Sequence, residues 1–409
     1  MGCGRPDHPQ RRADARGVRP VSRPIAVYVH IPFCTIKCGY CDFNAYAGMD
    51  SLKFRYAAAV VREVRLSAEL FEGREVASIA FGGGTPGEMA PEALRAIIEA
   101  VRSVAPVRGD TEVSLEANPG TTGGEALAAL RAAGVNRVSF GAQSFEADEL
   151  RFLDRIHSPE ATAAAVDLAR RAGMPSVGLD LIYGLPGQTV DGWQRTLEAA
   201  LALPVDHLSC YALTVEDGTA LARRVEAGDV TMPEPDLVAD LYELASDVLG
   251  AAGFDQYEIS NWARPGHQSR HNRTYWTDGE YLAFGAGAHG YLAGERYENI
   301  AHPRAYIEAV EAGTGQCPAV ASRYTPGGAT AMSDWFAART RLLEGFDPAE
   351  FARRFGVTLE AAAGPVLAEC AGAGVLELSP RVRLTRRGRL LHGEVAARFL
   401  AHVAFRAPA

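Results

Sequence analysis

Short apolar runs alternate with longer helical segments from Ile25 onward. The runs lie at 25–31, 76–81, 112–117, 137–143, 176–184 and 207–214, and helical patterns between them include 51–70 and 91–103. Strands separated by helices in this way are typical of repeated βαβ units, which build a parallel sheet. The nearly continuous apolar character of the runs predicts strands that are covered on both faces.

A doubly wound sheet and a barrel both fit this order of elements. Polar or glycine positions fall at or just after the carboxyl ends of four predicted strands: Gly82–Gly84, Glu116, Asn118, Gln143 and Asp180. Ligands bind at this rim in parallel α/β folds. Because several strands contribute polar groups to the same rim, we favour the barrel over the doubly wound sheet. The prediction is an α/β fold with a partial (βα)6-type barrel.

The chain divides into three predicted parts. Residues 1–23 carry six Arg and two Asp with little apolar periodicity, which predicts a flexible basic tail. A core barrel with a following extension is expected over 24–325. Helical patterns near 333–343 and 359–373, then VRLTRRGRLL and a final helix, predict a small helical or winged-helix-like domain over 326–409.

Composition and charge narrow the class of protein. With 47% hydrophobic and 22% charged residues the chain is ordinary globular protein, which excludes a fibrous or mostly disordered one. A formal net charge of −9 argues against a nucleic-acid binder. No apolar run approaches the ~18 residues of a membrane span, and no signal peptide is visible. We therefore predict a cytoplasmic protein, with peripheral attachment of the basic tail to anionic lipid left open.

Three of the seven cysteines lie close together. Cys34, Cys38 and Cys41 form C-x3-C-x2-C within HIPFCTIKCGYCDF, residues 30–43, on a loop that follows the first strand. Three thiolates at this spacing can hold three irons of a [4Fe–4S] cluster and leave the fourth open. Zinc sites normally close a four-ligand tetrahedron, and no second C-x2-C or paired His follows. His30 precedes the loop and is interpreted as a packing or hydrogen-bonding residue.

This cysteine motif resembles that of the radical S-adenosylmethionine (SAM) superfamily. FGGGTP (81–86) is similar to the segment that holds the SAM amino group in that superfamily. Longer motifs narrow the resemblance, among them LEANPGT (115–121), NRVSFGAQSF (136–145), DLIYGLPGQT (180–189) and YALTVEDGT (211–219). They resemble the oxygen-independent coproporphyrinogen oxidase family, which includes HemN oxidases and HemW haem chaperones. The resemblance runs from about residue 25 to the C-terminus.

The resemblance implies a [4Fe–4S] cluster on Cys34, Cys38 and Cys41 and a bound SAM. It implies SAM contacts at Tyr28, Tyr40, Gly83, Gly84, Thr85, Glu116, Gln143, Arg155 and Asp180. The carboxylates in this set can accept from ribose hydroxyls or the amino group, and the Arg155 guanidinium can grip a carboxylate. An alternative for Arg155 is an ion pair with Asp154 or Glu160.

Two departures separate the chain from the oxidase branch. The oxidase has a fourth cysteine, C-x3-C-x2-C-x-C, where this chain has Phe43, and a longer segment before the loop. Both departures resemble the haem chaperones. SRHNRTYW (269–276) also contains H-N-x-x-Y-W, a motif associated with haem binding in HemW-like proteins.

Within that motif, His271 could ligate haem iron, while Tyr275 and Trp276 could offer flat apolar surface. Alternatively, His271 and Asn272 pin a loop near the barrel mouth. His289 and Cys210 are weaker ligand candidates, and His157 is interpreted as structural.

The resemblance therefore implies a haem chaperone that binds haem and passes it to acceptor haem proteins, a respiratory enzyme being one candidate on family grounds. The cluster and SAM would then regulate transfer or oligomeric state, including a homodimer. One alternative is a coproporphyrinogen III oxidase that decarboxylates propionate side chains. Another is a radical SAM enzyme acting on haem itself, such as a ring-opening methyltransferase. The electron donor is not identified by the sequence.

Overall fold

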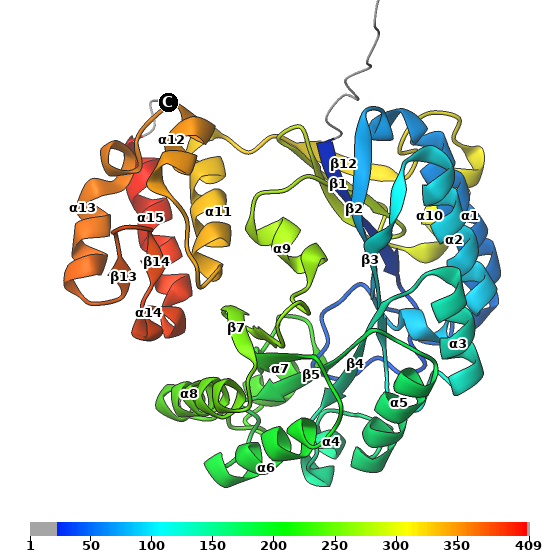
Figure 1. The fold of residues 1–409 in the computed structure, drawn as a ribbon, viewed down its shortest axis with the longest axis horizontal. Coiled ribbons are helices and arrows are strands. Elements are labelled where there is room, and N and C mark those ends of the chain that lie inside the picture. The colour runs from blue at the N-terminus through cyan, green and yellow to red at the C-terminus, as the bar shows by residue number, and fades with distance from the viewer. Residues whose placement is uncertain (1–22, 407–409) are drawn as a thin grey trace, which may run out of the picture.

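Six parallel strands form the centre of the molecule. The computed structural model describes residues 23–406 (Figure 1). The strands are β1 (Arg23–Ile31), β2 (Arg74–Gly83), β3 (Val107–Ala117), β4 (Arg137–Gln143), β5 (Ser176–Tyr183) and β6 (His207–Ala212), and each pairs in parallel with the next along the chain. A doubly wound sheet would reverse its strand order part-way, and this sheet does not. The predicted partial barrel is confirmed.

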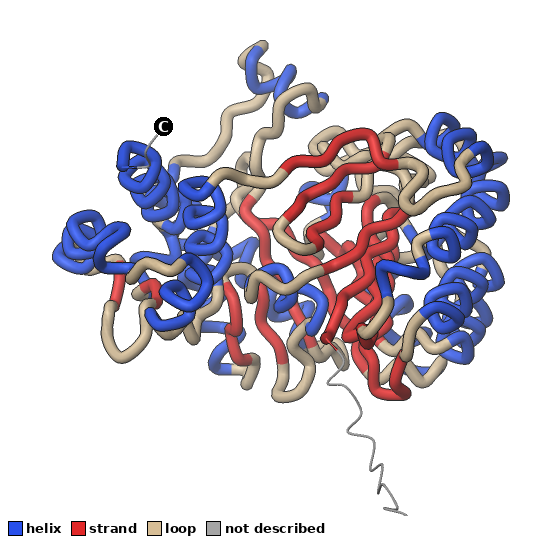
Figure 2. Tube along the Cα trace, turned by 90° about the horizontal axis from the view of Figure 1, so that it is seen from above, coloured by secondary structure: helices blue, strands red, loops and turns tan. Residues whose placement is uncertain are grey.

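The sheet continues beyond the six predicted strands at both edges. Next to β1 come β9 (Tyr281–Phe284), β10 (His289–Leu292), β11 (Glu295–Asn299) and β12 (Val320–Tyr324), and next to β6 come β8 (Asn261–Ala263) and β7 (Asp255–Glu258). All these neighbours pair antiparallel except β9, which is parallel to β1. The twelve-stranded sheet ends in β12 and β7, which do not pair with each other, so the barrel is open (Figure 2).

The two faces of the curved sheet differ in polarity. On β3, Ser114 and Glu116 face a cavity inside the barrel, while Val113 and Leu115 are buried in the hydrophobic core. The same alternation holds on β4, β5 and β6. Strands β4 and β5 are buried along nearly their whole length, so both of their faces are covered, as predicted. The outer face packs on helices, whereas the inner face lines a polar cavity.

Helices cover the outside of the barrel (Figure 1). They are α1 (Lys53–Leu66), α2 (Pro91–Val104), α3 (Gly124–Ala133), α4 (Ala147–Phe152), α5 (Pro159–Arg171), α6 (Val190–Leu201), α7 (Ala220–Glu226) and α8 (Pro235–Ala251), followed later by α10 (Pro303–Ala312). The predicted helix at 51–70 is α1 flanked by short 3₁₀ turns. Side-chain N-caps fix several starts: Ser158 accepts from the Ala161 N–H, and Thr189 from the Gly192 N–H.

Helix α9 (Arg270–Trp276) does not join this outer layer. It lies between the barrel and the C-terminal helices (Figure 1). Glu112 on β3 accepts the backbone N–H groups of Arg270 and His271, at 3.0 Å each. A carboxylate on the first turn of a helix satisfies N–H groups that otherwise lack partners. The strand thereby anchors α9.

A second hydrophobic core forms near the C-terminus. The elements around it are α11 (Gly328–Arg341), α12 (Pro348–Phe355), α13 (Leu359–Gly372), β13 (Leu376–Glu377), β14 (Arg383–Leu384), α14 (Arg386–Leu390) and α15 (His392–Arg406). Phe336 stacks on Phe399 with ring centroids 4.1 Å apart, and Phe346 and Phe351 complete the centre. Helix α11 begins five residues before the predicted one. The predicted division at 325/326 stays a prediction.

The predicted basic tail lies outside the described residues, except at its last position. Arg23 belongs to β1, because its N–H donates to the Gly73 carbonyl at 3.2 Å, so the expected tail extends one residue too far. Within residues 23–406, no helix has the length and apolar character of a membrane span.

Candidate functional site

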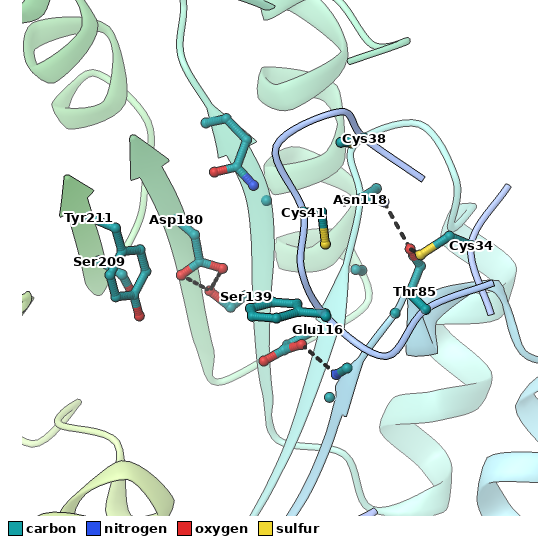
Figure 3. A pocket seen from close by; sticks show the side chains of 18 of the residues that line it. Cys34, Cys38, Cys41, Thr85, Glu116, Asn118, Ser139, Asp180, Ser209 and Tyr211 are labelled. Carbon is teal, nitrogen blue, oxygen red and sulfur yellow. Dashed lines mark hydrogen bonds between the residues drawn. The ribbon is translucent and has the colours of Figure 1, made fainter. Parts of the chain in front are cut away.

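The cysteine loop lies at the carboxyl end of β1 and is held at several points. Cys34 Sγ is 3.3 Å from Thr85 Oγ1, and Arg155 Nη1 donates to Cys38 Sγ at 3.7 Å. The Gly39 N–H donates to Asp154 at 3.0 Å. Figure 3 shows the three cysteines on one side of a pocket and Asp180, Ser209 and Tyr211 on the other. Burial raises the pKa of the thiols of Cys34 and Cys41.

The three thiols fit an iron–sulfur cluster better than a single ion. In the described part of the chain, no three His, Cys, Asp or Glu side chains converge closely enough to hold one metal ion. A cluster differs, because each cysteine binds a different iron and the thiols must stand apart. His30 is not available as a fourth ligand: its Nδ1 bonds the Tyr28 hydroxyl at 3.0 Å and its Nε2 bonds the Asn44 carbonyl at 2.9 Å. Its predicted hydrogen-bonding role is confirmed.

The glycine run brings β2 against the cysteine loop. A Cβ on Gly84 would come within 2.6 Å of the Phe33 carbonyl oxygen, so the two backbones can approach only through glycine. Gly83 has a φ of +109°, and a Cβ there would collide with the His30 ring. The resulting bend turns the Gly83 N–H toward Glu116, to which it donates at 3.2 Å.

Two carboxylates lie deep inside the barrel. Ser139 Oγ lies 3.0 Å from both carboxylate oxygens of Asp180 (Figure 3). Burial, with the charge of Asp180, raises the pKa of Glu116 to about 7. Burial also raises the pKa of Asp180. A cationic or hydroxyl-bearing ligand would relieve this repulsion, which is the chemistry expected where an amino group and a ribose bind. Asp180 lies within β5, three residues before its end, and not at the rim as expected.

Arg155 faces the same cavity. Its Nη2 donates to Asn118 Oδ1 at 2.5 Å and to the Gly141 carbonyl at 2.6 Å. Its Nε is buried without a protein partner. In the described structure, Arg155 pairs with neither Asp154 nor Glu160, so the alternative ion pair is wrong. An unpartnered guanidinium N–H beside the cysteine loop fits a ligand carboxylate.

All the predicted cluster and SAM residues, together with His271, line this one cavity of about 550 Å³. They are Tyr28, Cys34, Cys38, Tyr40, Cys41, Gly83, Gly84, Thr85, Glu116, Gln143, Arg155, Asp180 and His271. The pairing of β4 with β5 shifts register between Gly141 and Gln143, and Gln143 has a φ of +65°. Strained backbone of this kind occurs at functional sites. Arginine and carboxylate groups on facing walls suit a zwitterionic ligand. The side chains therefore fit both SAM and a cluster.

Substitution of Arg155 tests its proposed contact with the SAM carboxylate. We expect Arg155→Met to keep the cluster but to weaken SAM binding by about 10- to 100-fold, because a charge-assisted hydrogen bond is lost. Equilibrium binding of SAM to the anaerobically reconstituted protein measures this. Arg151→Met, on the exposed side of α4, is the control. Equal SAM affinity in both variants would remove Arg155 from the binding set.

His271 is placed in the cavity wall by two hydrogen bonds. Its Nδ1 lies 2.9 Å from Ser78 Oγ and its Nε2 2.7 Å from the Tyr275 hydroxyl. Burial lowers the pKa of His271 to about 3, which keeps the imidazole neutral. These contacts favour the pinning alternative over iron ligation. The Arg341 guanidinium covers one face of Trp276, 4.4 Å from its ring centre, and Trp276 lines neither cavity near the motif.

The remaining histidine and cysteine candidates lie elsewhere. His157 Nε2 donates to the Ala142 carbonyl of β4 at 3.0 Å, as expected for a structural residue. His289 and Cys210 do not line the cavity. The sequence analysis missed Ser139, Ser209 and Tyr211, which do. Their signal was present as a polar residue at every second position of the β4 and β6 runs.

Comparison with known proteins agrees with this arrangement. The family model of the radical SAM superfamily matches residues 28–200, and that of the HemN C-terminal domain matches residues 329–391. The haem chaperone HemW of Mycobacterium tuberculosis is 41% identical over 96% of this chain and 99% of its own length. The chain belongs to the HemW family. Bacillus subtilis HemW is 34% identical over 92% of this HemW-family chain and all of its own length.

A solved structure of an enzyme has the same fold. Coproporphyrinogen III oxidase (HemN) from Escherichia coli has a TM-score of 0.80 and 25% identity, covering 93% of this chain and 91% of that one. The radical SAM fold of the HemW-family chain is thus shared with an enzyme. The predicted resemblance to the family is confirmed, and membership implies SAM and an iron–sulfur cluster.

Proposed function

We propose that the protein is a haem chaperone that binds one haem and delivers it to acceptor haem proteins. The observation that carries this proposal is the 41% identity, over nearly the whole of both chains, to a relative named haem chaperone HemW. The similarity includes the barrel and the C-terminal helices, so it does not rest on the radical SAM motif alone.

The resident cofactors of this proposal are a [4Fe–4S] cluster and SAM. Cys34, Cys38 and Cys41 would bind three irons, and SAM would occupy the open one. Gly83 and Gly84 would approach the amino group, Arg155 the carboxylate, and Glu116 and Asp180 on the cavity wall the ribose or amino group. When bound, this pair supplies one-electron cleavage of SAM. The chain's own residues would position SAM beside the cluster.

Phe43 distinguishes the chaperone from the oxidase. It replaces the fourth cysteine of the oxidase motif, and its ring is 59% exposed at the cavity mouth. Its carbonyl accepts a hydrogen bond from Lys37 Nζ at 3.0 Å, so the loop closes without a fourth thiol. The likeness to HemN keeps coproporphyrinogen III oxidation as the second candidate function.

We place this activity in the cytoplasm. All six cysteines within the described residues are free thiols, including the buried Cys210, Cys317 and Cys370. Reduced thiols and an oxidation-sensitive cluster suit a reducing compartment. A respiratory acceptor, a homodimer and peripheral membrane attachment through the basic tail stay predictions.

An anaerobic assay with two substrates tests the proposal. The protein is reconstituted with iron and sulfide and given SAM and a reductant, with coproporphyrinogen III in one tube and haem in another. We expect stable haem binding by absorbance and no decarboxylated product by mass spectrometry. Cys38→Ser, without a complete cluster, is the control for product formed by other routes.

Multiple-turnover formation of protoporphyrinogen by the wild-type protein, absent in the control, would overturn the chaperone proposal. It would establish the oxidase and mean that Phe43 can replace the fourth cysteine. Absence of both haem binding and product would remove both candidate functions.

A further inference from the structure

A second cavity, of about 290 Å³, lies between the barrel edge and the C-terminal helices. We call it the interdomain cleft and define it by Tyr281, Tyr291 and Arg296 on the barrel side and Ala338, Trp335 and Arg354 on the helical side. None of these residues lines the cavity of the cysteines. The cleft therefore needs its own explanation.

The walls of the interdomain cleft suit a flat aromatic ligand. On the barrel side, Tyr281 lies 4.7 Å from Tyr275 and 6.4 Å from Tyr291 between ring centres. On the other side, α11 contributes Trp335 and Ala338. The Trp335 ring is buried against Phe346 and Phe351 and backs this wall, and the small Ala338 side chain leaves room in front of the helix. Aromatic rings stack on or pack against a planar π-system. A rigid, flat ligand would contact both walls at once.

The cleft also carries two half-exposed arginines. Arg354 donates from Nε to Asp278 at 2.9 Å and from Nη2 to the Tyr291 hydroxyl at 2.8 Å. Arg296 pairs with Asp334 at 2.9 Å. The exposed fractions of the two arginine side chains are 44% and 39%. Such exposed pairs contribute little, and a guanidinium has five N–H donors. Both arginines can therefore take a ligand carboxylate.

The cavity of the cysteines is less suited to a second large ligand. Its thiols, arginine and acids already match a cluster and SAM, and both ring nitrogens of His271 are bonded. Tyr275 lines both cavities, so the H-N-x-x-Y-W helix is the wall between them. From this wall the motif can affect the binding of haem without supplying a ligand to the haem iron.

We propose that the interdomain cleft is the docking site of the cargo haem. The porphyrin lies between Tyr281 and Tyr291 on one side and the α11 face on the other, with its two propionates on Arg296 and Arg354. This inference rests on the proposed haem-chaperone function and deepens it by giving the cargo a place outside the SAM cavity.

The test titrates haem and haem dimethyl ester into the full-length protein. We expect the double variant Arg296→Gln, Arg354→Gln to bind haem about 100-fold more weakly, about tenfold for each arginine, because each loses a charge-assisted hydrogen bond. Its affinity for the ester, which has no propionate charge, should match that of the wild type. Ala338→Trp should place a bulky side chain in the interdomain cleft and weaken the binding of both haem and its dimethyl ester. Arg55→Gln, equally exposed and paired with Glu311, is the control.

Cluster content and SAM affinity should stay unchanged in every cleft variant, which shows that each is folded. If the double variant binds haem as tightly as the wild type while His271→Ala loses haem, the cargo lies in the first cavity and this inference is wrong, although the chaperone function stands. If the wild-type protein does not bind haem, the chaperone function fails and the inference fails with it.

Discussion

Replacing Cys38 with serine is expected to abolish the iron–sulfur cluster. A serine hydroxyl stays protonated where a thiol becomes a thiolate, so only two of three irons would keep a ligand. Iron and sulfide after anaerobic reconstitution should fall from about four each per chain to near zero, with loss of the brown visible absorbance. SAM affinity should fall with them, because the open iron is one of its anchors.

The matched control for this experiment is Cys210→Ala. Cys210 is buried in β6, and its side chain points to the hydrophobic core and not to the cavity. That variant should keep its iron and sulfide. The Cys38→Ser protein should also keep its unfolding temperature without the cluster, since the loop is held by Gly39 and other residues at the same time. Unchanged iron and sulfide in Cys38→Ser would refute the ligand assignment.

The sequence predicted the parallel half of the sheet well, because each long strand is a separate apolar run. Glu116, Gln143 and Asp180 could be placed in one cavity for the same reason: consecutive parallel strands bring their carboxyl halves together. The strands β7 to β12, which extend the sheet at both edges, were not predicted. They are three to five residues long and include polar runs such as β11, ERYEN, so no periodicity marks them. Their pairing depends on partners far along the chain.

The sequence also could not predict which side chains that are far apart along the chain contact each other. In the sequence Arg155 lies close to Asp154 and Glu160, and an ion pair with one of them was the alternative to a SAM contact. In the structure its partners come from other strands and loops, namely Cys38, Asn118 and Gly141. The motif resemblance identified Arg155 as a ligand contact, whereas local charge pairing predicted a different role. Position in the fold decides between such alternatives.

Glu63 on α1 is another residue whose role only the fold shows. It is 1% exposed and accepts hydrogen bonds from the Gly285 N–H at 3.0 Å, Asn299 Nδ2 at 3.0 Å and the Tyr306 hydroxyl at 2.7 Å. These donors belong to the turn after β9, to β11 and to α10. One buried carboxylate thus ties α1 to the antiparallel extension of the sheet.

Replacing Glu63 with alanine should lower the free energy of unfolding by about 3–5 kcal/mol, because three buried donors lose their acceptor and a cavity opens. Burial raises the pKa of Glu63 to about 7 from an ordinary 4.5. The folded state therefore binds the proton more tightly than the unfolded state. The stabilisation that comes from the raised pKa of Glu63 is fully present below pH 4.5. It is lost as the pH rises through 7, and the free energy of unfolding falls by about 3 kcal/mol in all.

Chemical unfolding at pH 5 and pH 8 measures both effects. Glu63→Gln keeps the shape but cannot titrate, so its stability should fall less between the two pH values than that of the wild type. Glu311→Ala, at an exposed carboxylate paired with Arg55, should change stability by less than about 0.5 kcal/mol at either pH. If Glu63→Gln and the wild type lose the same stability between pH 5 and pH 8, the carboxylate is not the titrating group. The link between α1 and the sheet extension would then depend on packing and not on charge.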